Sequence, residues 1–131
     1  MNIEQKVKAI VDALEDIKAK DIVVLDTKKM TAMFERMVIA SGDSNRQTRA
    51  LAHHVRDKMK EAGVYVGNME GEQTGEWVLL DLGEVIVHVM QPAVRALYNL
   101  EELWSAGAAV RSQNVEQRSQ KAEKPATKIE T

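Results

Sequence analysis

Three histidines are the side chains of this chain best suited to metal binding or proton transfer near neutral pH. His53 and His54 are adjacent on a predicted helix, where neighbouring side chains point in different directions, so they do not easily share a metal ion. His88 lies between two valines in an apolar run, and we favour a hydrogen-bonded strand histidine over a catalytic one. The chain has no cysteine and no phosphate-binding glycine loop of either common spacing. The sequence therefore predicts neither a metal site nor a cofactor.

Two carboxylates, Asp26 and Asp81, each end an apolar run. If they lay close together, they could bind magnesium or act as an acid and a base. Aspartates at strand ends more commonly accept hydrogen bonds from the backbone amides of the turn that follows. We favour this second interpretation, because the sequence does not show that the two carboxylates approach one another.

The turn SGDSN at 41–45 leads into a predicted helix, whose free N–H groups make a generic anion site. One interpretation is contact with a phosphate or an RNA backbone through Ser41, Ser44 and Arg46. The other is a capped helix start, because Ser44 and Gln47 have the spacing of a capping box. We favour the capped start.

The large aromatic side chains include Trp77, Tyr98 and Trp104. Tryptophan and tyrosine are enriched at the hot spots of protein interfaces, but they also fill cores. We assign Trp104 to the core. For Trp77 and Tyr98 the residues alone support a core position and a binding surface about equally.

The stretch EWVLLDLGEVIVHVMQ at 76–91 must position several of these residues. Two apolar runs flank Gly83-Glu84, which predicts two antiparallel strands joined by a tight turn. Alternation of side chains puts Trp77 and Val78 on opposite faces. Both faces are apolar near the start of the first strand. Either the hairpin is covered on both faces, or one face is left open for a partner.

The other elements complete an α/β fold, a mixed five-stranded sheet with helices packed on it. Residues 1–104 are predicted to form one domain. Residues 105–131 lack aromatic side chains and are thinly apolar, so they are predicted to be a disordered polar tail. The predicted order is a helix at 2–19, strands at 21–27 and 34–41, a helix from 44 to about 62, strands at 64–69, 77–82 and 85–90, and a short helix at 93–98 that breaks near Asn99 and ends near Trp104.

Length and charge narrow the class of protein. The chain has 131 residues and a formal net charge of −2, which supports one domain without a global attraction to nucleic acid or anionic lipid. No apolar run approaches the roughly 20 residues that span a bilayer, and MNIEQKVKAI is not a secretion signal. We therefore expect a cytoplasmic protein with no membrane contact. The basic residues are scattered, which argues against nucleic-acid binding as the main activity.

Three stretches together resemble one known family. They are KAKDIVVLDT at 18–27, VIASGDSNRQTRALA at 38–52, and the block at 70–104 that contains the hairpin. In this order they look like the ribosomal silencing factor family, also called Iojap-like. The resemblance covers nearly all of residues 2–104, and the final block is the most specific part.

The resemblance implies a non-enzymatic regulator with a nucleotidyltransferase-like topology. Members of the family bind the fourteenth-numbered protein of the large ribosomal subunit, block docking of the small subunit and damp translation when nutrients are scarce. The resemblance also implies a homodimer. A minor contact to ribosomal RNA would use Arg46, Arg49 and Arg95.

The alternative function is a magnesium-dependent nucleotidyltransferase-like enzyme. Such enzymes carry a paired-carboxylate signature after a Gly-Ser turn, and Ser41-Gly42 is not followed by an Asp-x-Asp pair in a strand. We therefore expect the fold without a catalytic carboxylate pair. Carried over to matching positions, the partner surface of the family corresponds to Trp77, Asp81, Leu82, His88, Arg95 and Tyr98. The sequence does not separate the residues that touch a partner from those that support the fold.

Overall fold

The predicted hairpin is present in the computed structural model, which describes residues 1–104 and 110–111. Strands β4 (Trp77–Asp81) and β5 (Val85–Met90) pair antiparallel. Between them Gly83 has a φ of +83°, a conformation that glycine adopts without a Cβ clash. The backbone N–H of Leu82 donates to the carbonyl of Val85 and closes the turn.

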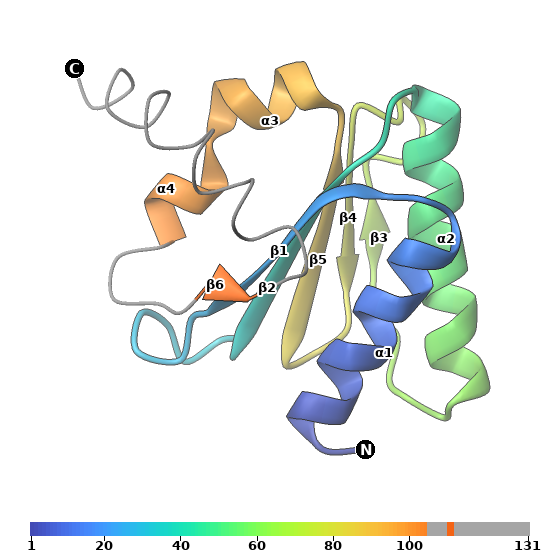
Figure 1. The fold of residues 1–131 in the computed structure, drawn as a ribbon. Coiled ribbons are helices and arrows are strands. Elements are labelled where there is room, and N and C mark those ends of the chain that lie inside the picture. Colours follow the sequence, from blue (N-terminus) through green and yellow to red (C-terminus); the bar gives the residue numbers. More distant parts are fainter. Residues whose placement is uncertain (105–109, 112–131) are drawn as a thin grey trace.

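A mixed sheet crosses the whole structure, as predicted, in the order β3-β4-β5-β2-β1-β6 (Figure 1). The pair β2–β5 is parallel, and every other pair is antiparallel. The strand β6, which pairs with β1, lies in the stretch predicted to be a tail. The rest of that stretch lies outside the described residues. The remaining strands are β1 (Lys20–Asp26), β2 (Arg36–Ser41), β3 (Met69–Glu70) and β6 (Val110–Arg111).

The third predicted strand, at 64–69, is shorter than expected. Only Met69–Glu70 form β3, opposite Leu80 and Leu79 of β4. The N–H of Gly67 still donates to the carbonyl of Asp81, the last residue of β4. Residues 64–66 would have to pair with the hairpin turn, which offers no strand. The predicted strand is therefore cut short because its partner, β4, ends at Asp81.

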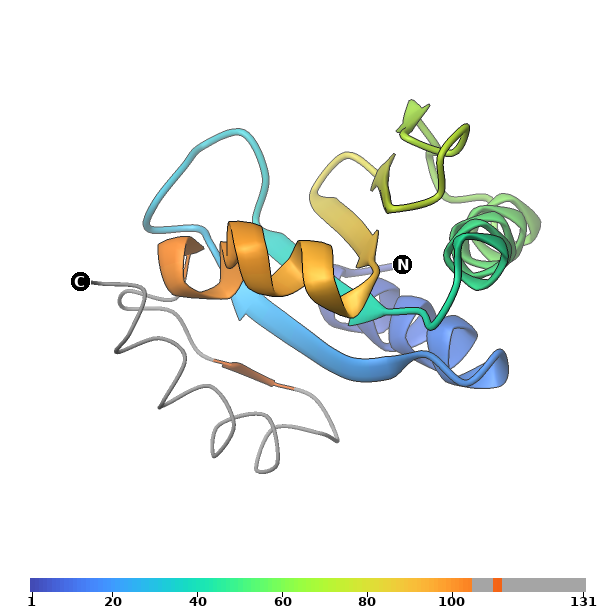
Figure 2. The same cartoon turned by 90° about the horizontal axis from the view of Figure 1, so that it is seen from above.

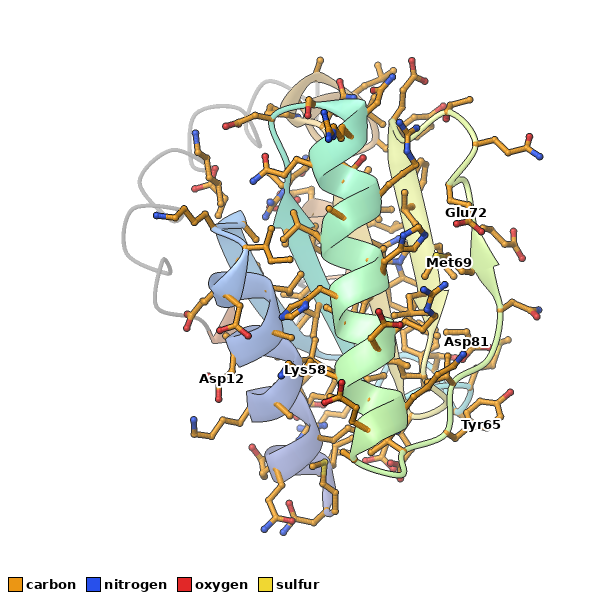
Figure 3. The ribbon with its side chains drawn as sticks, turned by 90° about the vertical axis from the view of Figure 1, so that its right-hand side faces the viewer. Asp12, Lys58, Tyr65, Met69, Glu72 and Asp81 are labelled. Carbon is orange, nitrogen blue, oxygen red and sulfur yellow. The ribbon has the colours of Figure 1, made fainter. Side chains whose placement is uncertain are left out.

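Helices α1 (Ile3–Asp16) and α2 (Asn45–Glu61) cover one face of the sheet and lie side by side in Figure 3. Both starts are capped, because the side chains of Asn2 and Ser44 accept from the backbone N–H groups three residues on. Gly63, just beyond the end of α2, has a φ of +74°. The main core lies between these helices and the sheet and includes Ile10, Leu14, Leu51, Val55, Val78, Leu80 and Val87.

Helices α3 (Pro92–Tyr98) and α4 (Leu100–Trp104) lie on the opposite face (Figure 2). The predicted break between them falls on Asn99, which has a left-handed φ of 46°. Beneath them a smaller core packs over β1, β2 and the end of β5, and the rings of Phe34 and Trp104 are 5.4 Å apart. This cover does not extend over all of β4, so part of the second face is open. None of the helices in the described part of the chain is long and apolar enough to cross a membrane.

Candidate functional site

The second face of the β4–β5 hairpin carries the residues that form the candidate site. Side chains alternate along each strand, so Trp77, Leu79 and Asp81 point to the same face. Leu79 lies opposite His88, and Asp81 lies opposite Ile86. Leu79 and Ile86 are only half-buried, whereas Val78 and Leu80 on the helix-covered face are completely buried.

A groove of about 540 Å³ opens on this face, and we call it the sheet groove. Its floor is formed by side chains of β2, β4 and β5. The 33–34 segment and α4 line one side, and residues 65–70 line the other. Most of the lining is apolar, and it includes Met33, Met37, Tyr65, Leu79, Ile86 and Leu100.

Three rings make an aromatic cluster beside the sheet groove. The indole Nε1–H of Trp77 donates to Nδ1 of His88 at 2.9 Å, and the rings of Trp77 and Tyr98 are 4.8 Å apart. An indole N–H can only donate, so Nδ1 of His88 carries no proton and the proton of the neutral ring is on Nε2. Burial lowers the pKa of His88 from 6.5 to about 4. The histidine is therefore neutral near pH 7.

Exposed apolar side chains also lie on α3 and α4, and one of them, Tyr98, packs against Trp77. Tyr98 is 56% exposed, Leu97 is 76% exposed and Leu103 is 64% exposed. An open apolar groove together with large exposed apolar side chains is typical of a surface that binds another macromolecule. Of the predicted partner residues, the structure brings Trp77, Asp81, His88 and Tyr98 to this one side of the sheet.

Leu82 and Arg95, which were also predicted as partner residues, are buried in the structure and contribute to the fold. Leu82 is completely buried in the main core, on the face covered by α1 and α2. Arg95 is 4% exposed, donates to Oγ of Ser41 at 2.8 Å, and holds the carboxylate of Glu101 through two hydrogen bonds of 3.2 and 3.0 Å. Burial lowers the pKa of Arg95 to about 10, so it stays charged at neutral pH.

The turn at 41–45 forms the capped helix start that we favoured. Ser41 is 2% exposed, and its hydroxyl accepts from Arg95 inside the fold. The hydroxyl of Ser44 accepts from the N–H of Gln47 at 3.0 Å, as an N-cap does. Arg46 is exposed. Both serine hydroxyls thus accept hydrogen bonds within the chain, and anion binding by Ser41, Ser44 and Arg46 stays a prediction.

Asp26 and Asp81 do not share a metal ion. β5 and β2 lie between their strands, so three strand spacings of about 4.8 Å separate them by about 14 Å, on opposite faces of the sheet. Asp26 accepts from the N–H of Lys28, and Asp81 accepts from the N–H of Gly83, as the turn interpretation predicted. Within the described residues, no group of three or more acidic or histidine side chains is placed to hold a metal.

Comparison with known proteins agrees with the earlier resemblance. A family model described as "Ribosomal silencing factor during starvation" matches residues 1–131. The chain belongs to this family of ribosomal silencing factors.

Two relatives show how far the similarity reaches. The "Ribosomal silencing factor RsfS" of Chromobacterium violaceum is 57% identical over 104 residues, which cover 79% of this chain and 85% of that protein. The protein of the same name from Bacillus subtilis is 38% identical over 104 residues, with 79% and 88% covered. A crystal structure of a Chromobacterium violaceum protein, 57% identical, has a TM-score of 0.78 and covers 79% of this chain and 87% of its own. The mixed α/β fold is therefore that of a ribosomal silencing factor.

Several residues of the site were not predicted from the sequence. Leu79 and Ile86 share the face of Trp77 and His88, so alternation along the hairpin could have added them. Met33 and Tyr65 line the sheet groove from segments without regular structure, and no sequence pattern indicated this.

Proposed function

We propose that this ribosomal silencing factor binds the large ribosomal subunit through the sheet groove and the neighbouring Trp77–Tyr98 rings. Its target there is the fourteenth-numbered protein of the large subunit. The observation that carries the proposal is the uncovered apolar face, because half-buried Leu79 and Ile86 share it with Trp77, whose ring packs against exposed Tyr98. Membership of the silencing family supports the ribosome as the partner.

The mechanism that we propose is steric. A standard protein interface buries about 1,600 Å² in total, which a domain of this size can supply from one face. The helix-covered face would then point away from the subunit. A factor that occupies the docking surface prevents the small subunit from joining, without any chemical step, and translation falls when nutrients are limiting.

We propose that the factor is not an enzyme, because Asp26 and Asp81 are kept apart by two strands and each accepts from a turn amide. Since ribosomes are its target, we place its action in the cytoplasm. The homodimer and a minor contact of exposed Arg46 to ribosomal RNA are separate proposals. The oligomeric state in sedimentation velocity and the salt dependence of RNA affinity test them.

Sedimentation with separated ribosomal subunits tests the proposed function. The full chain is mixed with purified large or small subunits and centrifuged through sucrose. We expect it to sediment with large subunits and to stay behind with small ones. A protein that sediments with neither subunit, or equally with both, contradicts the proposal.

A further inference from the structure

The chain carries its charges unevenly. Residues 61–94 hold six acidic residues and neither lysine nor arginine. The rest of the chain holds all 18 lysines and arginines and the other 14 of the 20 acidic residues. The overall charge of −2 therefore conceals a strongly acidic segment, and this segment contains β3, β4 and β5, which border the open face.

Two of these carboxylates line the sheet groove itself, namely Asp81 and Glu70. Asp81 accepts from the N–H of Gly83. Among the described residues, neither carboxylate has a lysine or arginine within ion-pair distance. Figure 3 shows Asp81 and Tyr65 together at one edge of the molecule, far from Asp12 on α1. The groove thus has an acidic border with no counterion from the described part of the chain.

His88 adds one polar group to this apolar groove. Its Nδ1 is occupied by Trp77, which leaves the Nε2–H as a neutral donor. The described part of the chain provides no acceptor for that N–H. An occupant of the groove can therefore offer an oxygen acceptor, such as a backbone carbonyl, to Nε2.

We propose that the occupant of the sheet groove is a basic segment of a ribosomal protein. An apolar side chain of that segment enters the groove, a lysine or arginine beside it pairs with Asp81 and Glu70, and a carbonyl accepts from His88. This inference rests on the proposed function and adds the chemistry of the partner. Ribosomal RNA does not fit the same surface, because its phosphates would face two carboxylates without a compensating cation.

Neutralising the acidic border distinguishes a basic protein segment from ribosomal RNA, because affinity is expected to fall for the first and to rise for the second. The double variant Asp81→Asn with Glu70→Gln keeps both side-chain shapes, and the introduced asparagine can still accept from the N–H of Gly83. The matched control, Asp12→Asn with Asp57→Asn, changes the net charge equally on exposed positions of α1 and α2. Affinity for purified large subunits, and for protein-free ribosomal RNA of that subunit, is measured by sedimentation at two salt concentrations.

We expect the groove variant to bind large subunits about tenfold more weakly, with a smaller salt dependence, while the control binds like the wild type. Unchanged or tighter binding of the groove variant overturns the inference, and so does an equal loss in the control. Tighter binding together with a gain in RNA affinity identifies RNA as the occupant. In these outcomes the wild type still binds large subunits, so the proposed function stands. A wild type that fails to bind overturns the proposed function and this inference together.

Discussion

The indole Nε1 of Trp77 and the Nδ1 of His88 are joined by a 2.9 Å hydrogen bond across the β4–β5 hairpin. The two residues are diagonal neighbours on the open face, because Trp77 lies opposite Met90 and His88 lies opposite Leu79. The bond fixes the orientation of the indole ring against Tyr98 and fixes the tautomer of the histidine. It therefore connects the aromatic cluster to the floor of the sheet groove.

Replacement of the indole tests this connection. Trp77→Ala removes the ring that supports Tyr98, and we expect affinity for large subunits to fall at least about tenfold, as at an interface hot spot. Trp77→Phe keeps a ring but leaves Nδ1 of His88 without a donor, which is expected to lower the free energy of unfolding by about 1–3 kcal/mol. Sedimentation and urea denaturation measure the two effects, with circular dichroism as a control for folding. Wild-type affinity in a folded Trp77→Ala protein would refute the contact role.

His88 makes stability depend on pH in a defined window. Its pKa is about 4 in the folded protein and about 6.5 in the unfolded chain, so the unfolded state binds more protons between these values. The contribution of neutral His88 to the free energy of unfolding is fully present above pH 6.5 and decreases as the pH drops. Near pH 4 about 3 kcal/mol of this contribution is lost.

The variant His88→Gln has no titrating ring, and its side-chain oxygen can accept from Trp77. We expect the free energy of unfolding, measured in urea between pH 7 and pH 4.5, to fall less steeply for this variant than for the wild type. If the free energy of unfolding fell equally with pH in the variant and in the wild type, His88 would not be the source of the pH dependence.

Replacement of Arg95 is predicted to lower the free energy of unfolding. Removal of one partner from a buried ion pair costs about 3–5 kcal/mol, so Arg95→Ala should lower the free energy of unfolding by about that amount. Arg95→Lys keeps the charge but not the two-bond contact to Glu101, and an intermediate loss is expected. A change below about 1 kcal/mol in Arg95→Ala would contradict the buried geometry.

Leu82 provides a comparison on the other face of the hairpin. Leu82→Ala opens a cavity in the main core and is expected to cost about 2–5 kcal/mol of stability. At a temperature where the variant is folded, its affinity for large subunits should equal that of the wild type. Weaker binding by a fully folded Leu82→Ala protein would return this residue to the contact surface.

The fold could be predicted from local patterns, and the site only in part. Gly83 between two apolar runs predicted the hairpin, and alternation predicted its two faces. The same alternation already places Leu82 on the face away from Trp77, so its place among the predicted partner residues came only from carrying a family motif over residue by residue. The separation of Asp26 from Asp81 depends on the strand order, which no local pattern contains. The burial of Arg95 depends on its contact with Ser41, which lies 54 positions earlier.

The joining of the two ribosomal subunits, followed by light scattering, tests the central claim most directly. Large subunits are incubated with the wild type, with Leu79→Glu on the floor of the sheet groove, or with Asp57→Asn on the helix-covered side, and small subunits are then added. Each variant is first shown to be folded by circular dichroism. We predict that the wild type and Asp57→Asn prevent the rise in scattering at stoichiometric amounts, and that Leu79→Glu does not. A wild type that leaves joining unchanged, or a folded Leu79→Glu that blocks joining equally well, would contradict the account.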